Sequence, residues 1–177
     1  SYPVGLYKSL IPGFIDALEK EIRYVGRMVD ENKFKVKSVY IGGGTPTALD
    51  DSNLNRVLRL VNEFFDITNI EFSVEAGRPD TITQEKLIAM NTNNVTRISI
   101  NPQTMNASTL KAIGRNHTPE AIIDKFNMAR DLGFNNINMD IIAGLPNEDN
   151  EMFKYTLEQI EKMAPDSLTV HTMAIKR

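Results

Sequence analysis

The sequence predicts an α/β fold in which parallel strands form a curved or barrel-like sheet. Short runs rich in β-branched or aromatic residues recur along the chain, as strands do. They span residues 36–41, 70–74, 95–100, 137–142 and 168–170. Between these runs, apolar residues recur every three or four positions, which is the spacing of one helical face. Strands that alternate with helices are parallel, because a helical crossover joins parallel neighbours and a hairpin cannot.

The pattern opens with a helix rather than a strand. A long helix is predicted over residues 7–30, and the helix after the first strand carries a set of apolar residues on one face. These are Leu54, Val57, Leu58, Val61 and Phe65. Because an α/β unit usually starts with a strand, we expect a first strand upstream of this chain. We also expect an exposed apolar sheet edge where that strand belongs.

Capping residues mark the ends of three further helices. Thr118 is a suitable N-cap with Pro119 at the first helical position, and Gly133 suits the left-handed C-terminal cap of the same helix. The other two sets are Asn106 with Gly114 around a shorter helix, and Thr83 with Glu85 at the start of another.

Composition restricts the function. The chain has 177 residues, of which 41% are hydrophobic, so residues 1–177 fit one domain with a real core. The chain has 20 Lys and Arg and 23 Asp and Glu, which gives a net charge of −3. This balance favours a small-molecule site and no nucleic-acid partner. No apolar run reaches the roughly 18 residues of a membrane span, and a signal-peptide pattern is lacking, so we expect a cytoplasmic protein. The absence of cysteine excludes disulfides, thiolate metal sites and a cysteine nucleophile within these residues.

Polar or glycine-rich residues lie at the end of every predicted strand. In a parallel α/β barrel the loops that follow the strands carry the chemistry. The candidates at this rim are Gly42, Gly43, Gly44, Glu75, Arg78, Asn101, Gln103, Asp140 and His171. We therefore expect these residues to share one ligand site.

The glycine triplet Gly42, Gly43 and Gly44 has two readings. It lets the backbone approach a ligand closely, or it forms a tight strand-to-loop turn. The loop matches neither the Walker phosphate loop nor Gly-x-Gly-x-x-Gly, so nucleotide phosphate is not the preferred ligand. A barrel that binds sugar phosphates stays as the least specific alternative.

Glu75 and Asp140 lie at or near the ends of apolar strands, where an unpaired buried carboxylate costs several kcal/mol. Their partners are either structural arginines, such as Arg78 or Arg97, or ligand groups such as hydroxyls and an ammonium. Gln103 either contacts a ligand or caps the following turn.

Arg115 follows a predicted helix end. It is either a bidentate clamp for a carboxylate or a solvated surface residue. His117 and His171 are read as structural residues, because a lone imidazole is more often hydrogen-bonded than metal-bound. No residue is assigned as catalytic or as a metal ligand.

Four segments together resemble one family. Residues 40–47, Tyr-Ile-Gly-Gly-Gly-Thr-Pro-Thr, are similar to the signature that follows the cluster loop in anaerobic coproporphyrinogen oxidases. Residues 139–146, Met-Asp-Ile-Ile-Ala-Gly-Leu-Pro, resemble their later Asp-x-x-x-Gly-Leu-Pro motif. Residues 75–83 and 100–106 resemble the oxygen-independent coproporphyrinogen III oxidase, or coproporphyrinogen dehydrogenase, branch of the radical S-adenosylmethionine (SAM) superfamily. The match covers nearly the whole chain in the expected order.

The resemblance implies a partial (β/α)6 TIM-like barrel, here lacking its first strand and cluster loop, with SAM across the carboxyl ends of the strands. The backbone at Gly42, Gly43 and Gly44 would then meet the methionine amino group. The family carries a [4Fe–4S] cluster on three cysteines in the pattern Cys-x-x-x-Cys-x-x-Cys. Because this chain has no cysteine, we expect that it begins just downstream of the cluster loop, with residues 1–5 as the tail of that loop. The chain alone would then be inactive.

By the same resemblance, Glu75 and Arg115 would hold the amino-acid end of SAM, Arg115 through the carboxylate. Gln103 and Asp140 would hydrogen-bond the ribose hydroxyls. The reaction implied is cleavage of SAM to a 5′-deoxyadenosyl radical, followed by oxidative decarboxylation of coproporphyrinogen III to protoporphyrinogen IX. Its partners are the porphyrinogen and an electron donor protein. The alternative is a haem-binding chaperone, since relatives of that kind share this core, although a chain poor in histidine offers few axial ligands.

Overall fold

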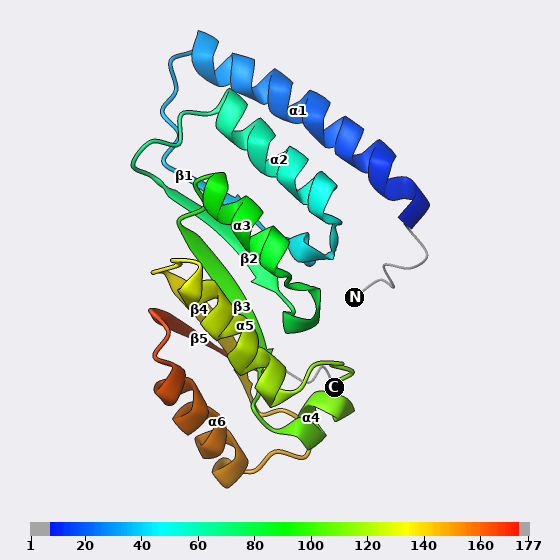
Figure 1. Ribbon diagram of the computed structural model, residues 1–177, viewed down its shortest axis with the longest axis vertical. Helices are drawn as coiled ribbons and strands as arrows, with labels where there is room; N and C mark the ends of the chain where they lie inside the picture. The colour runs from blue at the N-terminus through cyan, green and yellow to red at the C-terminus, as the bar shows by residue number, and fades with distance from the viewer. Residues whose placement is uncertain (1–7, 174–177) are drawn as a thin grey trace.

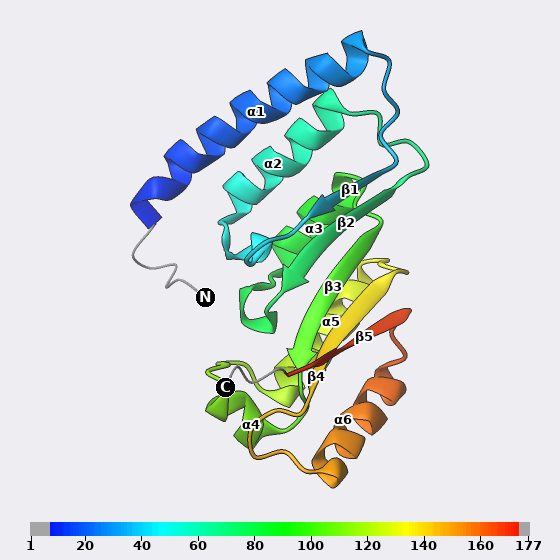
Figure 2. The same cartoon turned by 180° about the vertical axis from the view of Figure 1, so that it is seen from behind.

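The computed structural model describes residues 8–173. Five parallel strands form one sheet whose spatial order follows the chain. They are β1 (Ser38–Ile41), β2 (Glu71–Gly77), β3 (Arg97–Gln103), β4 (Ile137–Ala143) and β5 (Ser167–Thr172). The sheet curves into a half-barrel, which confirms the predicted strands and the partial barrel (Figure 2). The predicted tail of a cluster loop at residues 1–5 lies outside the described residues.

Helices cover one face of the sheet and leave the other face open (Figures 1 and 2). The α-helices are α1 (Ile11–Glu31), α2 (Asp51–Phe64), α3 (Gln84–Thr92), α4 (Ala107–Ala112), α5 (Pro119–Asp131) and α6 (Asn150–Met163). Short 3-10 turns precede α1 (η2, Lys8–Leu10) and follow β1 (η3, Pro46–Ala48) and β2 (η4, Pro79–Thr81). Helix α1 lies outermost and packs against α2 (Figure 1). Within residues 8–173, no helix combines the length and apolar content that a membrane crossing requires.

The helix ends follow the predicted capping chemistry with one exception. The Thr118 hydroxyl accepts from the Ala121 amide at the start of α5, and Gly133 after its end has φ +92°. The Thr83 hydroxyl likewise accepts from the amide of Lys86 in α3. Asn106 stands at the N-cap position of α4, but its side chain makes no capping hydrogen bond.

The side chain of Asn106 instead ties α4 to α6. Its amide donates to the Glu148 carboxylate at 3.0 Å, to the Met152 carbonyl at 3.0 Å and to the Thr156 hydroxyl at 3.1 Å. Helix α6 is thereby held against the loop that follows β3. These contacts join residues more than 40 positions apart, which explains why local capping patterns do not reveal them.

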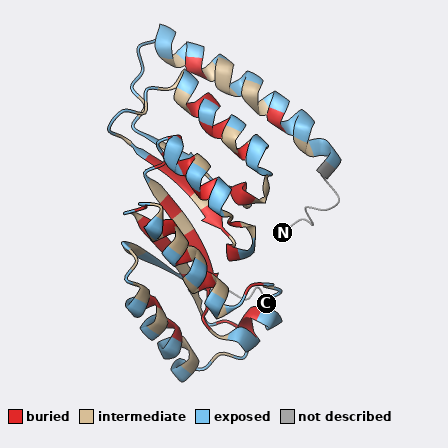
Figure 3. Ribbon diagram, in the orientation of Figure 1, coloured by how far each residue is buried: buried red, intermediate tan, exposed pale blue. Residues whose placement is uncertain are grey.

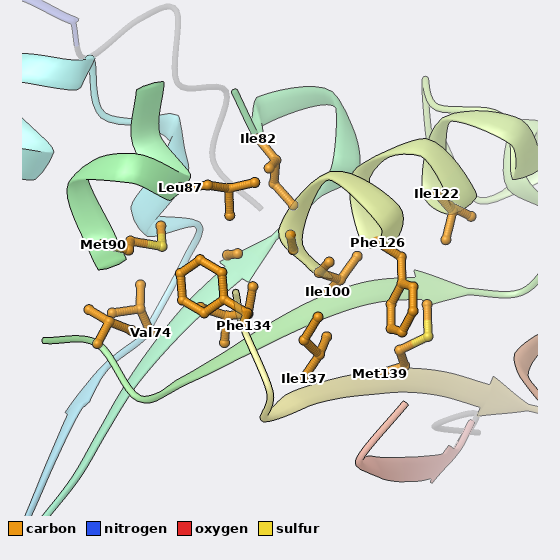
Figure 4. Packing of buried hydrophobic residues seen from close by; sticks show 14 of the residues in the cluster. Val74, Ile82, Leu87, Met90, Ile100, Ile122, Phe126, Phe134, Ile137 and Met139 are labelled. Carbon is orange, nitrogen blue, oxygen red and sulfur yellow. The ribbon is translucent and has the colours of Figure 1, made fainter. Parts of the chain in front are cut away.

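The core lies between the sheet and the helices (Figures 3 and 4). Alternate side chains of a strand point to opposite faces. On β2, β3 and β4 one set is apolar and buried against the helices, as with Val74 and Ile100 packed near Leu87, Met90 and Phe126 (Figure 4). The corresponding residues of β5, Leu168 and Val170, are exposed. The opposite set is polar and faces the open side of the half-barrel. It includes Glu71, Ser73, Glu75, Arg97, Ser99, Asn138, Asp140, Ser167, Thr169 and His171.

Strand β1 forms one edge of the sheet within the described residues, because it pairs with β2 alone. The expected free edge is therefore present, but it is only partly apolar. Val39 and Ile41 are half-buried against the core, whereas Tyr40 is 68% exposed and faces the polar side.

Candidate functional site

A cavity of about 1000 Å³ opens at the carboxyl ends of the strands. Its wall brings together five of the seven predicted ligand residues, Gly44, Glu75, Gln103, Arg115 and Asp140. Gly42 and Gly43 precede Gly44 in the same loop but do not line the cavity. Residues from β2, β3, β4 and two connecting loops therefore converge on one space, as the predicted rim requires.

The glycine loop folds onto the Glu75 carboxylate. The Gly43 amide donates to Glu75 Oε2 at 3.2 Å. A Cβ on Gly42 would clash with Cε1 of Tyr40 and lie 3.0 Å from Glu75 Oε2, so a side chain fits there only if Tyr40 moves. Gly43 and Gly44 have φ +82° and +119°, and open space surrounds both. The triplet thus forms a tight turn, which confirms that interpretation, and the backbone approach to a ligand stays a prediction.

Buried polar contacts fix the loops that follow β1 and β2. The Lys86 ammonium is almost completely buried and donates to the carbonyls of Thr47 at 2.7 Å and Thr81 at 3.1 Å. The Thr47 hydroxyl also bonds the Ala76 carbonyl. A buried charge is tolerated only when it is hydrogen-bonded, so Lys86 holds the two loops together beneath the cavity. The sequence interpretation missed this residue, because its partners are backbone atoms far along the chain.

The two candidate carboxylates have partners other than those suggested by the sequence. Glu75 accepts from the Gly43 amide. Asp140 accepts from Nδ2 of Asn138 at 2.6 Å, and Nε2 of His171 lies 3.9 Å from its other oxygen. Each carboxylate therefore stays close to the cavity without a neutralising arginine.

The suggested arginine partners, Arg78 and Arg97, are wrong for both carboxylates. Arg97 lies lower in the half-barrel, 3.8 Å from Glu71, and donates to the Ser167 hydroxyl at 3.0 Å. Arg78 lines the cavity and forms no ion pair within residues 8–173. The physical reason for Arg97 is register. It begins β3 on the polar face and pairs with Ser73, so it lies below the level of Glu75, which pairs with Ser99.

A hydrogen-bonded row of strand residues orients Asp140. Ser167 and Thr169 on β5 donate to the side-chain oxygen of Asn138 at 2.8 and 3.2 Å, and the Asn138 amide then donates to Asp140. A smaller hollow of about 270 Å³ lies along this row. Asp140 and His171 line both spaces, so the polar interior continues below the main cavity.

Gln103 ends β3 in an unusual backbone conformation. It has φ +67°, and the pairing with β4 shifts register between Ile100 and Gln103. A non-glycine residue held there costs about 1–3 kcal/mol, and such strain is frequent at ligand sites. Its side chain is buried at the cavity and makes no hydrogen bond to the described part of the chain. The turn is capped by Thr104 instead, whose hydroxyl accepts from the Asn106 amide at 3.1 Å, so the capping interpretation of Gln103 is wrong.

Arg115 is half-buried rather than solvated. Burial is the main cause that lowers the pKa of Arg115, the positive charge of Arg78 lowers it further, and Asp80 opposes the change. The guanidinium nevertheless stays charged. No carboxylate lies within ion-pair distance of it among residues 8–173. The interpretation as a solvated surface residue is therefore wrong.

Two further polar residues lie at or beside the cavity with unsatisfied groups. Asn101 is 9% exposed, and its buried Oδ1 has no hydrogen-bond partner in the described chain. His117 is also buried, 3.9 Å from Asp80, and bonds neither Thr118 nor any other described side chain. Burial lowers the pKa of His117, with the Pro102 carbonyl and Asp80 opposing. Asn101 directly follows a predicted strand, so its position at the strand end could have identified it as a ligand-site residue.

The charges and donors of the cavity suit a ligand with several polar groups. Glu75 and Asp140 can accept from an ammonium or hydroxyls, while Arg115 can bind a carboxylate. A second hollow of about 830 Å³, near Phe34 and Phe64 at the other end of the molecule, brings together none of the predicted residues. Within residues 8–173, no three His, Asp or Glu side chains are grouped as metal ligands. The cavity thus combines acceptors and a cation that can bind and orient a ligand with several polar groups.

Several known proteins are similar to this chain in sequence and in fold. The family model described as the radical SAM superfamily matches residues 7–160. The oxygen-independent coproporphyrinogen-III oxidase-like protein HemZ of Bacillus subtilis is 47% identical over 179 residues, covering 100% of this chain and 36% of that protein. The heme chaperone HemW of the same organism is 28% identical, covering 92% of this chain and 43% of its own length.

A solved structure agrees with these sequence matches. Coproporphyrinogen III oxidase (HemN) from Escherichia coli, a radical SAM enzyme, has a TM-score of 0.82 and 31% identity, covering 93% of this chain and 37% of that one. The chain thus spans well under half the length of the relatives it matches. On the family match and the shared half-barrel, the chain belongs to the radical SAM superfamily.

Proposed function

We propose that this chain is the SAM-binding core of an oxidoreductase that decarboxylates coproporphyrinogen III to protoporphyrinogen IX. The observation that carries the proposal is the convergence of Gly44, Glu75, Gln103, Arg115 and Asp140 on one cavity at the carboxyl ends of the strands. The likeness to proteins named as oxygen-independent coproporphyrinogen III oxidases supports the choice of reaction.

Each residue has a role that its chemistry suits. Glu75 and the open backbone of the glycine loop accept from the methionine ammonium, and Arg115 forms paired hydrogen bonds with the methionine carboxylate. Asp140 and Gln103 bond the ribose hydroxyls, which both donate and accept. The side-chain oxygen of Asn101 is buried without a partner in the described chain and fits a polar ligand, because an unmet buried polar group costs free energy. The Gln103 side chain also lines the cavity.

The cofactors supply the difficult chemistry, and the chain supplies position. A reduced [4Fe–4S] cluster together with SAM provides the one-electron cleavage from which hydrogen abstraction starts. This chain has no cysteine, so cluster ligands would come from outside these 177 residues. Its own residues hold SAM by both ends, so that the carbon between the adenosine and the sulfur keeps one position.

The test uses the full-length protein with a reconstituted cluster under anaerobic conditions. SAM, a reductant and coproporphyrinogen III are added, and porphyrins, 5′-deoxyadenosine and carbon dioxide are quantified. We expect 5′-deoxyadenosine and carbon dioxide to form with protoporphyrinogen IX. Formation of 5′-deoxyadenosine without any porphyrin product would contradict the substrate and keep the SAM site, whereas no SAM binding at all would contradict both.

A second candidate function is haem binding and delivery, which the likeness to proteins named as heme chaperone HemW favours. It predicts a Soret shift when haem is added to the full-length protein, together with no conversion of coproporphyrinogen. Titration followed by visible absorbance separates the two functions, because the oxidase does not require retention of haem.

A further inference from the structure

Two arginines of the cavity differ from the other partly buried arginines of the molecule. Within residues 8–173, Arg23, Arg97 and Arg130 each lie within ion-pair distance of a carboxylate. Arg78 and Arg115 are also partly buried, but no ion pair is formed by either. Both line the cavity of about 1000 Å³. The one wall thus carries two guanidinium groups that have no ion-pair partner within the described residues.

This arrangement is unfavourable for the empty protein. Arg78 and Arg115 line the same cavity, and the positive charge of Arg78 adds to burial in lowering the pKa of Arg115, as repulsion between like charges does. Asp80 offsets only part of this repulsion. Like charges on a partly desolvated wall gain most from an anion that binds between them.

We propose that Arg78 is a second carboxylate-binding residue and that it forms, with Arg115, a two-arginine subsite for a carboxylate of the ligands bound in this cavity. The proposal rests on the proposed function, because it takes the cavity to be the SAM site. A carboxylate fits this wall better than an uncharged group does, because the planar guanidinium group matches the two carboxylate oxygens. Glu75 and Asp140 repel an anion, so a carboxylate of the ligand binds at the part of the wall that carries Arg78 and Arg115.

The local structure holds the Arg78 backbone and leaves its side chain available. The carbonyl of Arg78 accepts from the amide of Thr81 at 3.0 Å and from the hydroxyl of Thr81 at 2.9 Å, and Pro79 follows directly. No hydrogen bond of the Arg78 side chain is found within the described chain. Replacing the side chain should therefore leave the loop and the fold intact.

Two carboxylates are candidates for this subsite. The methionine part of SAM carries one, and the side chains of coproporphyrinogen carry propionates. In both cases a carboxylate binds to the paired arginines. The two sources can be distinguished with ligand analogues that lack the carboxylate in question. Decarboxylated SAM lacks the first, and coproporphyrin III tetramethyl ester lacks the second.

The experiment compares Arg78→Gln with wild type in the full-length, cluster-reconstituted protein. Arg59→Gln is the matched control, because Arg59 is an exposed arginine of α2 that does not line the cavity. Equilibrium dissociation constants are measured for SAM, decarboxylated SAM, coproporphyrin III and its tetramethyl ester. Thermal unfolding confirms that each variant is folded.

The outcomes distinguish the sources. If Arg78 binds the methionine carboxylate, Arg78→Gln weakens SAM about 10- to 100-fold and leaves decarboxylated SAM unchanged. If it binds a propionate, the same loss appears for coproporphyrin III and not for its ester. Arg78→Lys should recover part of the loss, because it keeps the charge without the fork.

The proposal is overturned if Arg78→Gln leaves both SAM and coproporphyrin III affinities at wild-type values. It is also overturned if the affinity for the carboxylate-free probes falls equally, which would mark a structural effect. Failure of the proposed function is a different result, namely wild-type protein that does not bind SAM.

Discussion

Asp140 joins the rigid interior of the sheet to the cavity. It lies on β4, accepts from Asn138 at 2.6 Å, and has His171 3.9 Å away. Through Asn138 it is connected to Ser167 and Thr169 on β5. Its oxygen positions are set by strands rather than by a mobile loop, which is the form of support that a binding residue needs.

Asp140→Asn is expected to weaken SAM binding about 10- to 100-fold, because an ionised acceptor of hydroxyl groups is replaced by a weaker neutral one. Fold and unfolding temperature should stay close to wild type. Isothermal titration of the full-length protein with SAM measures the effect. Asp131→Asn, an exposed carboxylate at the end of α5, is the control, and equal SAM affinity in Asp140→Asn and wild type would rule out the assigned role.

His117 predicts a pH dependence of stability. Burial lowers its pKa in the folded protein, so the folded state favours the neutral ring. The unfolded chain takes up a proton below about pH 6.5, where the folded protein does so only at lower pH. The contribution of His117 is therefore complete above about pH 6.5 and decreases as the pH falls below that value.

The measurement is the thermal unfolding temperature of wild type and His117→Gln between about pH 5 and 7, a window above the titration of most carboxylates. Wild type should lose stability more steeply toward acid than the variant. Parallel pH profiles for the two proteins would disprove the assignment to His117.

At the scale of single residues, the sequence predicted those that lie at strand ends. It missed those whose role depends on tertiary neighbours. The positions of Glu75, Gln103 and Asp140 could be predicted from the sequence, because each is a polar residue at or near the end of an apolar strand. Arg78 was predicted at this rim and as a partner of these carboxylates, but local spacing does not say that it lines the cavity beside Arg115 without an ion pair. That placement depends on the folded loop after β2, where the Arg78 carbonyl accepts from Thr81.

At the scale of elements, the contact between α1 and α2 depends on a glycine. A Cβ at Gly26 would meet the Cβ of Phe64 at 2.7 Å and its carbonyl oxygen at 3.0 Å. Arg23, one turn earlier, lies 4.8 Å from the centre of the Phe64 ring. The two helices therefore approach closely only because position 26 has no side chain.

Gly26→Ala should destabilise the protein by about 1–3 kcal/mol, the range typical of overpacking. Gly13→Ala in the same helix is the matched control, because nothing lies within 4 Å of a Cβ there. The control should be neutral or stabilising, since alanine favours helix over glycine. Thermal unfolding of both variants is the measurement, and an equal response of the two would show that the close contact does not limit packing.

Sequence patterns predicted the elements but not all of their limits. Strand β3 continues through Asn101 and Pro102 to Gln103, beyond the predicted end at residue 100, because the shifted pairing with β4 accommodates a proline and a positive φ. The attachment of α6 by Asn106 could not be foreseen either. It depends on a network whose members are distant in sequence.

At the scale of the whole molecule, a half-barrel with an apolar outer face and a polar inner face explains why the site forms. The apolar set packs on helices, so the polar set must face the open side (Figures 2 and 3). Alternating strands and helices were sufficient to predict this architecture, because parallel strands have all their carboxyl ends at one rim and crossovers of one hand place the helices on one face.

We infer that the cavity at the carboxyl ends of β2, β3 and β4 holds SAM. A crystal structure of the full-length protein with SAM bound tests this inference. We expect the ribose beside Gln103 and Asp140, and the methionine carboxylate beside Arg115. A SAM molecule bound elsewhere, for example in the hollow near Phe34, with this cavity unfilled, would contradict it.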